Sequence, residues 1–215
     1  MRLNLPPKEL LVKTGDVDYY DWNYKFPIKY VQQYRFKRIL KRLRIFNVNT
    51  LLEVGTGSGI FLPELSKNCK HLYACDIHEH FESARNICAY YNINHVHFST
   101  QSIEKTNYES NTFDVIIAVS VLEFVNDIHT ALQEIKRILK KNGVLITICP
   151  MENKLLDTVV SFYSRLKASD EFGESRKNVG STLEKNFEII KKGSMLPILG
   201  KWWPVYTDYV LRNTK

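Results

Sequence analysis

The sequence has few cysteines, and their spacing suits neither a disulfide framework nor a metal site. The four are Cys69, Cys75, Cys88 and Cys149, and they contain no Cys-x-x-Cys pair or other metal-ligand pattern. Each lies in or beside an apolar stretch, which is typical of buried, reduced thiols. We therefore expect no metal site and a reducing, cytoplasmic environment.

Long apolar runs are also missing. No window reaches the ~18 apolar residues that a membrane-spanning helix needs. The N-terminal stretch MRLNLPPKELLVK lacks the continuous apolar core of a secretory signal. Hydrophobic residues make up 44% of the chain and charged residues 25%, which is ordinary for a folded protein. We expect one domain over residues 1–215 with no transmembrane segment.

One region of the chain has no acidic residues, and it contributes much of the positive net charge. The chain has 30 Lys and Arg against 23 Asp and Glu, a net charge of +7. Residues 28–46 hold seven basic residues and no acid. Such a helix most often presents a solvated basic face. Contact with RNA phosphates or with an anionic membrane surface stays open as an alternative, and nucleic acid is not favoured.

The apolar residues that are present recur with alternating periods. A helical pattern over 28–46 precedes strand patterns at 50–54, 71–77, 95–99, 113–120 and 143–150. Helical patterns lie between them at 59–67, 78–91 and 126–140, the last with Asp127 as N-cap and Asn142-Gly143 as its stop. After 150 we expect a further helix over 151–168 and closing strands at 187–193 and 204–213. This alternation predicts an α/β, doubly wound parallel sheet with helices on both faces.

The stretch LLEVGTGSGI at 51–60 contains the most informative turn. No Lys follows its glycines, so it is not a Walker A loop, and Ile60 stands where a dinucleotide fingerprint needs glycine. A carboxylate at the strand end, Glu53, suits a ligand that bears a cation. Asp76 ends the next strand, where an acid hydrogen-bonds the hydroxyls of a ribose. Together these residues indicate an adenosine-type ribose with an amino-acid tail.

Four motifs in this order resemble the class I S-adenosylmethionine-dependent methyltransferases, in the group that contains ubiquinone/menaquinone-biosynthesis and small-molecule enzymes. They are LLEVGTGSG, ACDIHE, QSIEKTNYESNTFDVIIAVSVLEFVND and LQEIKRILKKNGVLITICP, and the similarity covers residues 48–150. The resemblance implies a Rossmann-like, seven-stranded, mostly parallel sheet whose last strand is antiparallel. It also implies S-adenosylmethionine as the cofactor.

Carried over position by position, the resemblance implies a set of cofactor-binding residues. Glu53 would lie near the ammonium of the methionine moiety, Asp76 would bind the ribose and Ile77 would pack on the adenine. The loop after the third strand departs from the family pattern, because Ser102 stands where many relatives have an acid. The implied set is Glu53, Gly55, Thr56, Gly57, Asp76, Ile77, Ser102, Ile103 and Ala118.

The acceptor side is less defined. Residues 1–46 combine an aromatic cluster, Tyr19 to Tyr24, with the basic helix, and the cluster is equally consistent with a lid or with core packing. Tyr20, Tyr24 and Glu123 are the substrate-side candidates. Residues 151–215 should supply an acceptor-side helix and hairpin. There MLPILGKWWPVY, with Trp202 and Trp203, is interpreted as a loop covering the core or, alternatively, as an apolar acceptor patch.

No single residue is indicated as catalytic, because methyl transfer needs a general base only for a weakly acidic acceptor. His78, His80, His129, Tyr20 and Glu123 are all candidates.

Absent motifs constrain the acceptor. The fourth strand does not end in the [DN]PP[YF] turn of enzymes that methylate DNA base amines, and no cysteine has the context of a pyrimidine C5 enzyme. A small-molecule or lipid-like acceptor is the first hypothesis. An RNA or protein methyltransferase is the second, and a nicotinamide-dependent oxidoreductase, opposed by Ile60, is the third.

Overall fold

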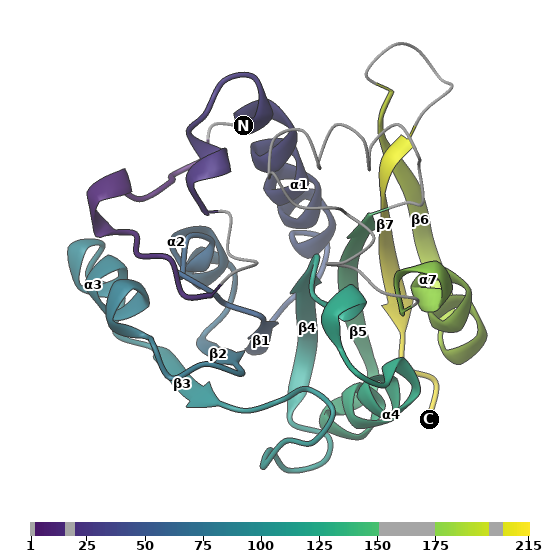
Figure 1. The fold of residues 1–215 in the computed structure, drawn as a ribbon. Helices are drawn as coiled ribbons and strands as arrows, with labels where there is room; N and C mark the ends of the chain where they lie inside the picture. The colour runs from purple at the N-terminus through teal and green to yellow at the C-terminus, as the bar shows by residue number, and fades with distance from the viewer. Residues whose placement is uncertain (1–2, 16–19, 151–174, 198–203) are drawn as a thin grey trace.

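Seven strands form one mixed sheet in the computed structural model, which describes residues 3–15, 20–150, 175–197 and 204–215. The strand order is β3-β2-β1-β4-β5-β7-β6 (Figure 1). Only β7 runs antiparallel to its neighbours, β5 and β6, so the predicted seven-stranded, mostly parallel sheet with an antiparallel last strand is confirmed. The strands are β1 Thr50–Val54, β2 His71–Asp76, β3 Val96–Thr100, β4 Phe113–Val119, β5 Leu139–Pro150, β6 Glu188–Pro197 and β7 Pro204–Arg212.

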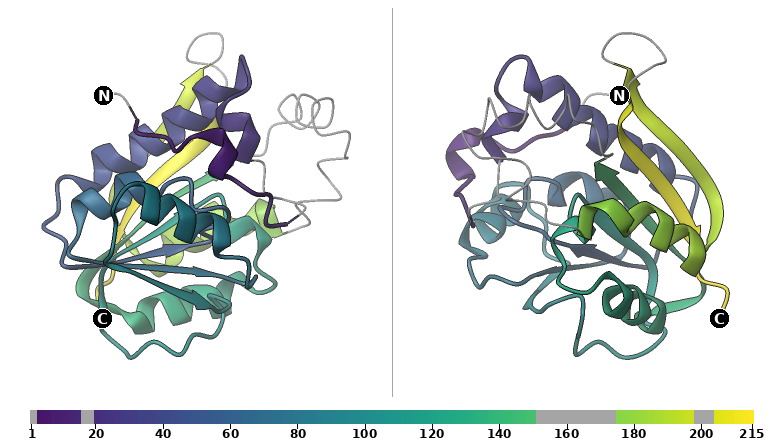
Figure 2. Two further views of the ribbon diagram at one scale, coloured as in Figure 1. Left: turned by 90° about the vertical axis from the view of Figure 1, so that its left-hand side faces the viewer. Right: turned by 45° about the vertical axis from the view of Figure 1, so that its right-hand side comes forward.

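Helices cover both faces of this sheet, as the two views of Figure 2 show. Helices α1, α2 and α3 pack on one face and α4 and α7 on the other. Their bounds are α1 Ile28–Leu43, α2 Leu62–Leu65, α3 Glu82–Tyr90, α4 Ile128–Ile138 and α7 Ser175–Asn186, with 3₁₀ turns at Lys8–Leu10, Tyr20–Asn23, Ser66–Asn68 and Leu122–Phe124. In the described ranges no helix has the length and apolarity needed to cross a bilayer. The helix predicted over 151–168 lies outside these ranges.

The central strands are buried on both sides, which explains their almost entirely apolar sequences. Successive side chains of a strand point to opposite faces. Leu51 therefore packs beneath α1–α3, whereas Leu52 packs against the α4–α7 layer, and neither is exposed to solvent. Strand β1 lies between β2 and β4, so the strand order reverses at this position. In doubly wound sheets such a reversal opens a crevice beyond the carboxyl ends of the strands.

Helix α1 differs from the expected solvated basic helix. Arg42 is buried, and its Nε donates to Asp208 Oδ2 of β7 at 2.7 Å. Arg38, one turn earlier, donates to the other carboxylate oxygen of Asp208 at 2.6 Å. The prediction is wrong for these two residues because a completely buried acid on β7 draws them inward.

The end of α4 also differs from the prediction, although Asp127 is the N-cap as expected and accepts from the His129 amide. The helix ends at Ile138 rather than at Asn142-Gly143, and β5 already begins at Leu139. Near the other end of the chain, Asn213 donates from its side chain to the carbonyl of Lys136 at 3.0 Å. This contact satisfies a carbonyl of the last helical turn, so the helix stops there. Asn142 and Gly143 instead lie where the pairing register of β5 with β4 shifts.

The turn after β1 depends on glycine, because Gly55, Gly57 and Gly59 all have positive φ, at 72°, 52° and 83°. At Gly59 an added Cβ would lie 2.7 Å from the backbone Cα of Ala84 on α3. That atom belongs to a packed helix and cannot move aside cheaply. A side chain at Gly59 would therefore be destabilising for two reasons, the left-handed backbone conformation and overpacking against α3.

We expect Gly59→Ala to lower the free energy of unfolding by about 3 kcal/mol. Urea denaturation measures the change. Gly15→Ala is the matched control, since nothing lies within 4 Å of a Cβ added at Gly15. A loss at Gly59 no larger than the loss at Gly15 would show that the turn tolerates a side chain.

Candidate functional site

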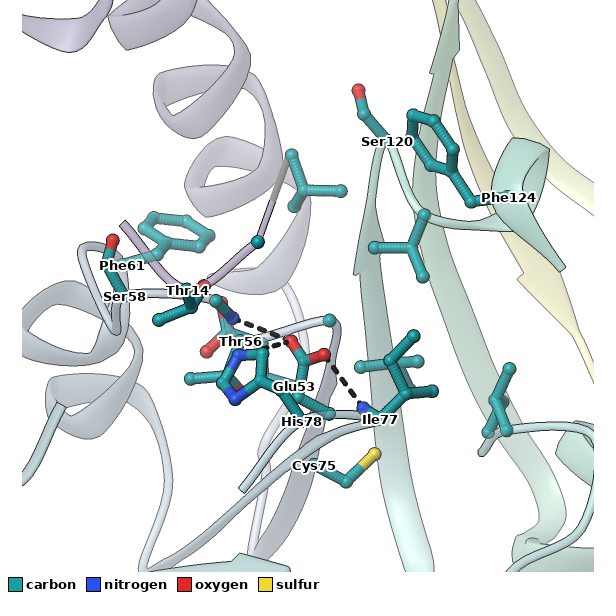
Figure 3. A pocket seen from close by; sticks show the side chains of 18 of the residues that line it. Thr14, Glu53, Thr56, Ser58, Phe61, Cys75, Ile77, His78, Ser120 and Phe124 are labelled. Atoms are coloured by element: carbon teal, nitrogen blue, oxygen red, sulfur yellow. Dashed lines mark hydrogen bonds and ion pairs between the residues drawn. The ribbon is translucent and has the colours of Figure 1, made fainter. Parts of the chain in front are cut away.

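A cavity of about 540 Å³ opens at the carboxyl ends of β1, β2 and β4, at the reversal of strand order. Its floor is the glycine turn after β1, and its sides come from the loops after β2, β3 and β4. The 3₁₀ turn Tyr20–Asn23 and the middle of α1 contribute a further wall, together with Tyr206 of β7. Figure 3 shows Glu53, Thr56 and Ile77 in its lower part and Ser120 and Phe124 on the β4 side.

Glu53 is the buried acid of this cavity, with 5% of its surface exposed. Its Oε2 has no hydrogen-bond partner among the described residues. Burial raises the pKa of this carboxyl to about 8, and the nearby Asp76 adds to the effect. Hydrogen bonds or a nearby cation favour the charged form of a buried carboxyl, and a ligand that carries a cation would supply the second of these.

Asp76 is the last residue of β2, and its carboxylate contacts the glycine turn that follows β1. Its Oδ2 accepts from the Gly57 amide and its Oδ1 from the Ile77 amide, both at 2.8 Å. His78 Nε2 lies 3.5 Å from Oδ2. Each carboxylate oxygen can accept more than one hydrogen bond, so both oxygens can still accept hydrogen bonds from a ligand. Two neighbouring hydroxyls match this arrangement.

Most of the residues predicted for the site lie on the wall of this one cavity. Ile77 has 78% of its surface exposed, which leaves an apolar side chain at the cavity edge for a ligand to cover. The predicted residues that line the cavity are Glu53, Gly55, Thr56, Gly57, Asp76, Ile77, Ser102, Ile103, Tyr20 and Glu123.

Two predicted residues are not part of the wall. Ala118 is wholly buried in the core on the α4 side, and its carbonyl accepts from Thr147 Oγ1 at 2.8 Å. The cavity wall at the end of β4 is formed by Val119, Ser120 and Val121 instead.

Tyr24 is not among the residues that line the cavity. Its hydroxyl donates to the Pro6 carbonyl at 2.6 Å, and its ring packs on the core beneath α1. Its pKa is raised, chiefly by burial. Of the aromatic cluster, Tyr20 and Trp22 line the cavity, and Tyr20 and Tyr24 both pack against the core. The lid stays a prediction. Tyr19, Trp202 and Trp203 lie outside the described residues.

Only some of the candidate general bases line the cavity. His78 lines the cavity beside Asp76. His80 and His129 are exposed and are not among the lining residues. Glu123 has 2% of its surface exposed and lines the cavity on the β4 side.

Sequence reasoning missed a polar group on the far wall, formed by Gln32, Arg35, Ser120 and Tyr206. Arg35 Nη1 donates to Ser120 Oγ at 2.8 Å, and the guanidinium lies 5.2 Å from the centre of the Tyr206 ring. These residues come from α1, from the loop after β4 and from β7. The only local signal is that Gln32 and Arg35 share a helix face with Phe36.

Comparisons with known proteins agree with this geometry. Residues 52–147 match the family described as "Methyltransferase domain". An uncharacterized protein of Methanocaldococcus jannaschii is 34% identical over 110 residues, covering 49% of this chain and 43% of that protein. A hybrid PKS-NRPS synthetase of Penicillium citrinum is 30% identical over 107 residues, covering 46% of this chain and 3% of that protein. The chain thus spans less than half the length of these curated relatives.

The whole fold also has solved counterparts. The N-methyltransferase NodS of Bradyrhizobium japonicum, solved in complex with S-adenosyl-L-homocysteine, superposes with a TM-score of 0.66 at 17% identity. The superposition covers 93% of this chain and 95% of that chain. At this identity the likeness concerns the fold.

Proposed function

We propose that this chain, of which residues 52–147 match the methyltransferase domain family, is a class I S-adenosylmethionine-dependent methyltransferase that transfers a methyl group to a small-molecule or lipid-like acceptor. The observation that carries the proposal is the meeting of Glu53, the glycine turn and Asp76 in one cavity at the reversal of strand order. The residues present fit this cofactor, because Glu53 is a buried carboxyl on the cavity wall whose Oε2 has no hydrogen-bond partner among the described residues, and a cationic tail would supply one.

The donor side of the mechanism follows from these residues. When bound, S-adenosylmethionine supplies an electrophilic methyl group on a sulfonium sulfur for in-line displacement by the acceptor atom. Glu53 would pair with the ammonium of the amino-acid tail, and Asp76 would accept from the ribose hydroxyls. Ile77 would pack on the adenine, with Ser102 and the backbone of Ile103 beside it.

The acceptor side excludes water and aligns the reactants. Tyr20 and Trp22 line the cavity at the 3₁₀ turn that precedes α1, and Phe124 lines it on the β4 side. Alignment and desolvation are the contributions that a displacement of this type needs from the protein. Glu123 is the candidate base on the acceptor side, whereas His78 lies beside Asp76 on the ribose side.

Part of the basic charge of α1 is not available to RNA, which favours a small acceptor. Arg38 and Arg42 are paired with Asp208 and are not available to phosphates. The cavity is lined by many apolar and aromatic side chains, as small-ligand sites usually are, together with ionisable residues that include Glu53, Asp76, Glu104, Glu123 and Arg35.

Incubation of the protein with methyl-labelled S-adenosylmethionine and a cell extract, followed by fractionation, tests the proposal. We expect label in the small-molecule or lipid fraction, and much less of it with the Asp76→Ala variant at the same subsaturating cofactor concentration. Label confined to RNA or protein would overturn the acceptor class. No label in any fraction would count against methyl transfer itself.

The raised pKa of Glu53 predicts that cofactor binding releases a proton. With a pKa of about 8 this carboxyl is mostly protonated at neutral pH in the free protein. Pairing with an ammonium lowers the pKa, so the proton leaves on binding and the affinity increases as the pH rises towards 8. Calorimetric titration with S-adenosylhomocysteine, in two buffers of different ionisation enthalpy, measures the released proton.

We expect the wild-type protein to release close to one proton near neutral pH and Glu53→Gln to release none. The exposed Glu79→Gln serves as the control and should behave as wild type. Equal proton release from wild type and Glu53→Gln would contradict the role given to Glu53.

A further inference from the structure

The outward face of α1 presents one continuous stripe of aromatic and basic side chains. Its members recur at intervals of three or four residues, which places them on the same side of the helix. The other side of α1, with Phe36 and Leu40, packs on the core. The α1 stripe consists of Phe26, just before the helix, and then Tyr30, Tyr34, Lys37, Lys41 and Arg44.

The aromatic part of the α1 stripe is open to solvent. Phe26 has 77% of its surface exposed, Tyr30 has 61% and Tyr34 has 37%. The side chain of Phe26 has no polar atom, so its transfer out of water is favourable. Its ring contacts Tyr30 edge-on, with the two ring centres 6.1 Å apart, and this contact leaves most of the ring uncovered. A partner that offers an apolar layer would cover it.

The basic part of the α1 stripe has no counter-charge within the described ranges. Its three cations form no ion pair with an acid there. No acid occurs at all over residues 22–52 of the sequence. The preceding acid, Asp21, is paired with Lys25. The α1 stripe is therefore complementary in charge to an anionic surface.

The aromatic end of the α1 stripe lies beside the cavity. The 3₁₀ turn Tyr20–Asn23, whose Trp22 and Asn23 line the cavity, comes shortly before Phe26. From there α1 runs towards the start of β1, as Figure 1 shows. Because the cavity lies at the opposite, carboxyl end of β1, the basic end of the stripe is the more distant one.

The ring geometry favours a lipid surface over single-stranded RNA. Successive bases stack on open, parallel ring faces. Phe26 and Tyr30 instead meet at 85°, and the Lys29 ammonium lies 5.4 Å from the centre of the Tyr30 ring. A bilayer surface needs no such stacking. Aromatic rings at headgroup depth, with lysines against anionic headgroups, are typical of proteins that bind it.

We propose that the α1 stripe docks on the surface of an anionic lipid bilayer. Phe26 and Tyr30 insert at headgroup depth, and Lys37, Lys41 and Arg44 lie against the anionic headgroups. Docking in this way places the cavity at the bilayer surface, where a lipid-like acceptor can enter it. The docking stands by itself, whereas the delivery of an acceptor rests on the proposed function.

Cosedimentation with lipid vesicles measures the docking and needs no cofactor. The vesicles are phosphatidylcholine, with or without about one third phosphatidylserine. One double variant, Phe26→Ser with Tyr30→Ser, removes the exposed rings. A second, Lys37→Gln with Lys41→Gln, removes two cations. Neither variant changes a residue that lines the cavity.

Each double variant has a matched control away from the α1 stripe. Tyr90→Ser removes a ring on α3 that has 59% of its surface exposed. Lys70→Gln with Lys185→Gln removes the same charge from two exposed lysines, before β2 and at the end of α7. Thermal unfolding and titration with S-adenosylhomocysteine show whether each variant keeps its fold.

We expect the wild-type protein to bind the phosphatidylserine vesicles, to bind the neutral vesicles far less, and to dissociate at high salt. Each stripe variant should weaken binding by about tenfold or more, since rings or cations leave the contact. The controls should stay within about twofold of wild type. The affinity for S-adenosylhomocysteine should be the same in all of them.

The proposal is overturned if the wild type does not bind phosphatidylserine vesicles, binds neutral vesicles equally well, or is matched by either stripe variant. Binding of a uridine oligonucleotide that the stripe variants lose, without vesicle binding, would assign this face to RNA. A dimer that the ring variant dissociates, without vesicle binding, would assign it to a second copy of the chain. A protein that docks on vesicles but does not bind S-adenosylhomocysteine would refute the proposed function and leave the docking intact.

Discussion

Asp76→Ala is expected to weaken binding of S-adenosylhomocysteine by at least about tenfold. The carboxylate ends β2 at the edge of the cavity, where its two oxygens accept the amides of Gly57 and Ile77 at 2.8 Å. Removing it takes away the acceptors that we propose for the ribose hydroxyls and also frees the glycine turn. Calorimetric titration of the variant against wild type gives the change in affinity.

The control for this experiment is Glu79→Ala, which removes an exposed acid three residues later and should leave the affinity unchanged. Asp76→Asn adds a second comparison, since it keeps one carbonyl oxygen and should lose less affinity than the alanine variant. An affinity of Asp76→Ala equal to that of wild type would refute the ribose contact.

The largest expected effect on stability comes from Asp208→Asn. Asp208 is completely buried on β7 and joins Arg38 and Arg42 of α1 at 2.6 Å and 2.7 Å. Neutralising the acid leaves two guanidinium groups without their counter-charge, one of them with only 6% of its side chain exposed. Breaking a buried ion pair from one side typically costs about 3–5 kcal/mol. Urea denaturation at neutral pH measures this loss.

Glu188→Gln provides the matched control on the adjacent strand. Its partner is Arg212, at 3.3 Å, and about half of the Glu188 side chain is exposed, at 49%. Solvent screens such a pair, so the loss should stay below about 1 kcal/mol. If Asp208→Asn costs no more than Glu188→Gln, the α1–β7 contact does not depend on this charge cluster.

The features that could be predicted from the sequence are those that a short, continuous segment of residues determines. The glycine turn and Asp76 follow strands whose apolar runs are unambiguous, and both meet at one edge because parallel strands end on the same side. The antiparallel β7 came from the family resemblance, and the sheet confirms it.

The features that could not be predicted depend on contacts between distant parts of the chain. Nothing near Arg38 or Arg42 in the sequence indicates a partner at Asp208, and nothing near Lys136 indicates that Asn213 will end α4. Neighbouring tyrosines also diverge: Tyr20 lines the cavity, while Tyr24 is drawn to the Pro6 carbonyl. Local patterns do not reveal which side of a short irregular segment faces the ligand.

Two matched titrations test the central claim, that the cavity beyond β1, β2 and β4 binds an adenosine with a cationic amino-acid tail. S-adenosylhomocysteine and NADH are each titrated calorimetrically into the wild-type protein under the same conditions. We expect S-adenosylhomocysteine to bind at micromolar concentrations and NADH not to bind. Binding of NADH in preference to S-adenosylhomocysteine, or of neither ligand, would contradict the account.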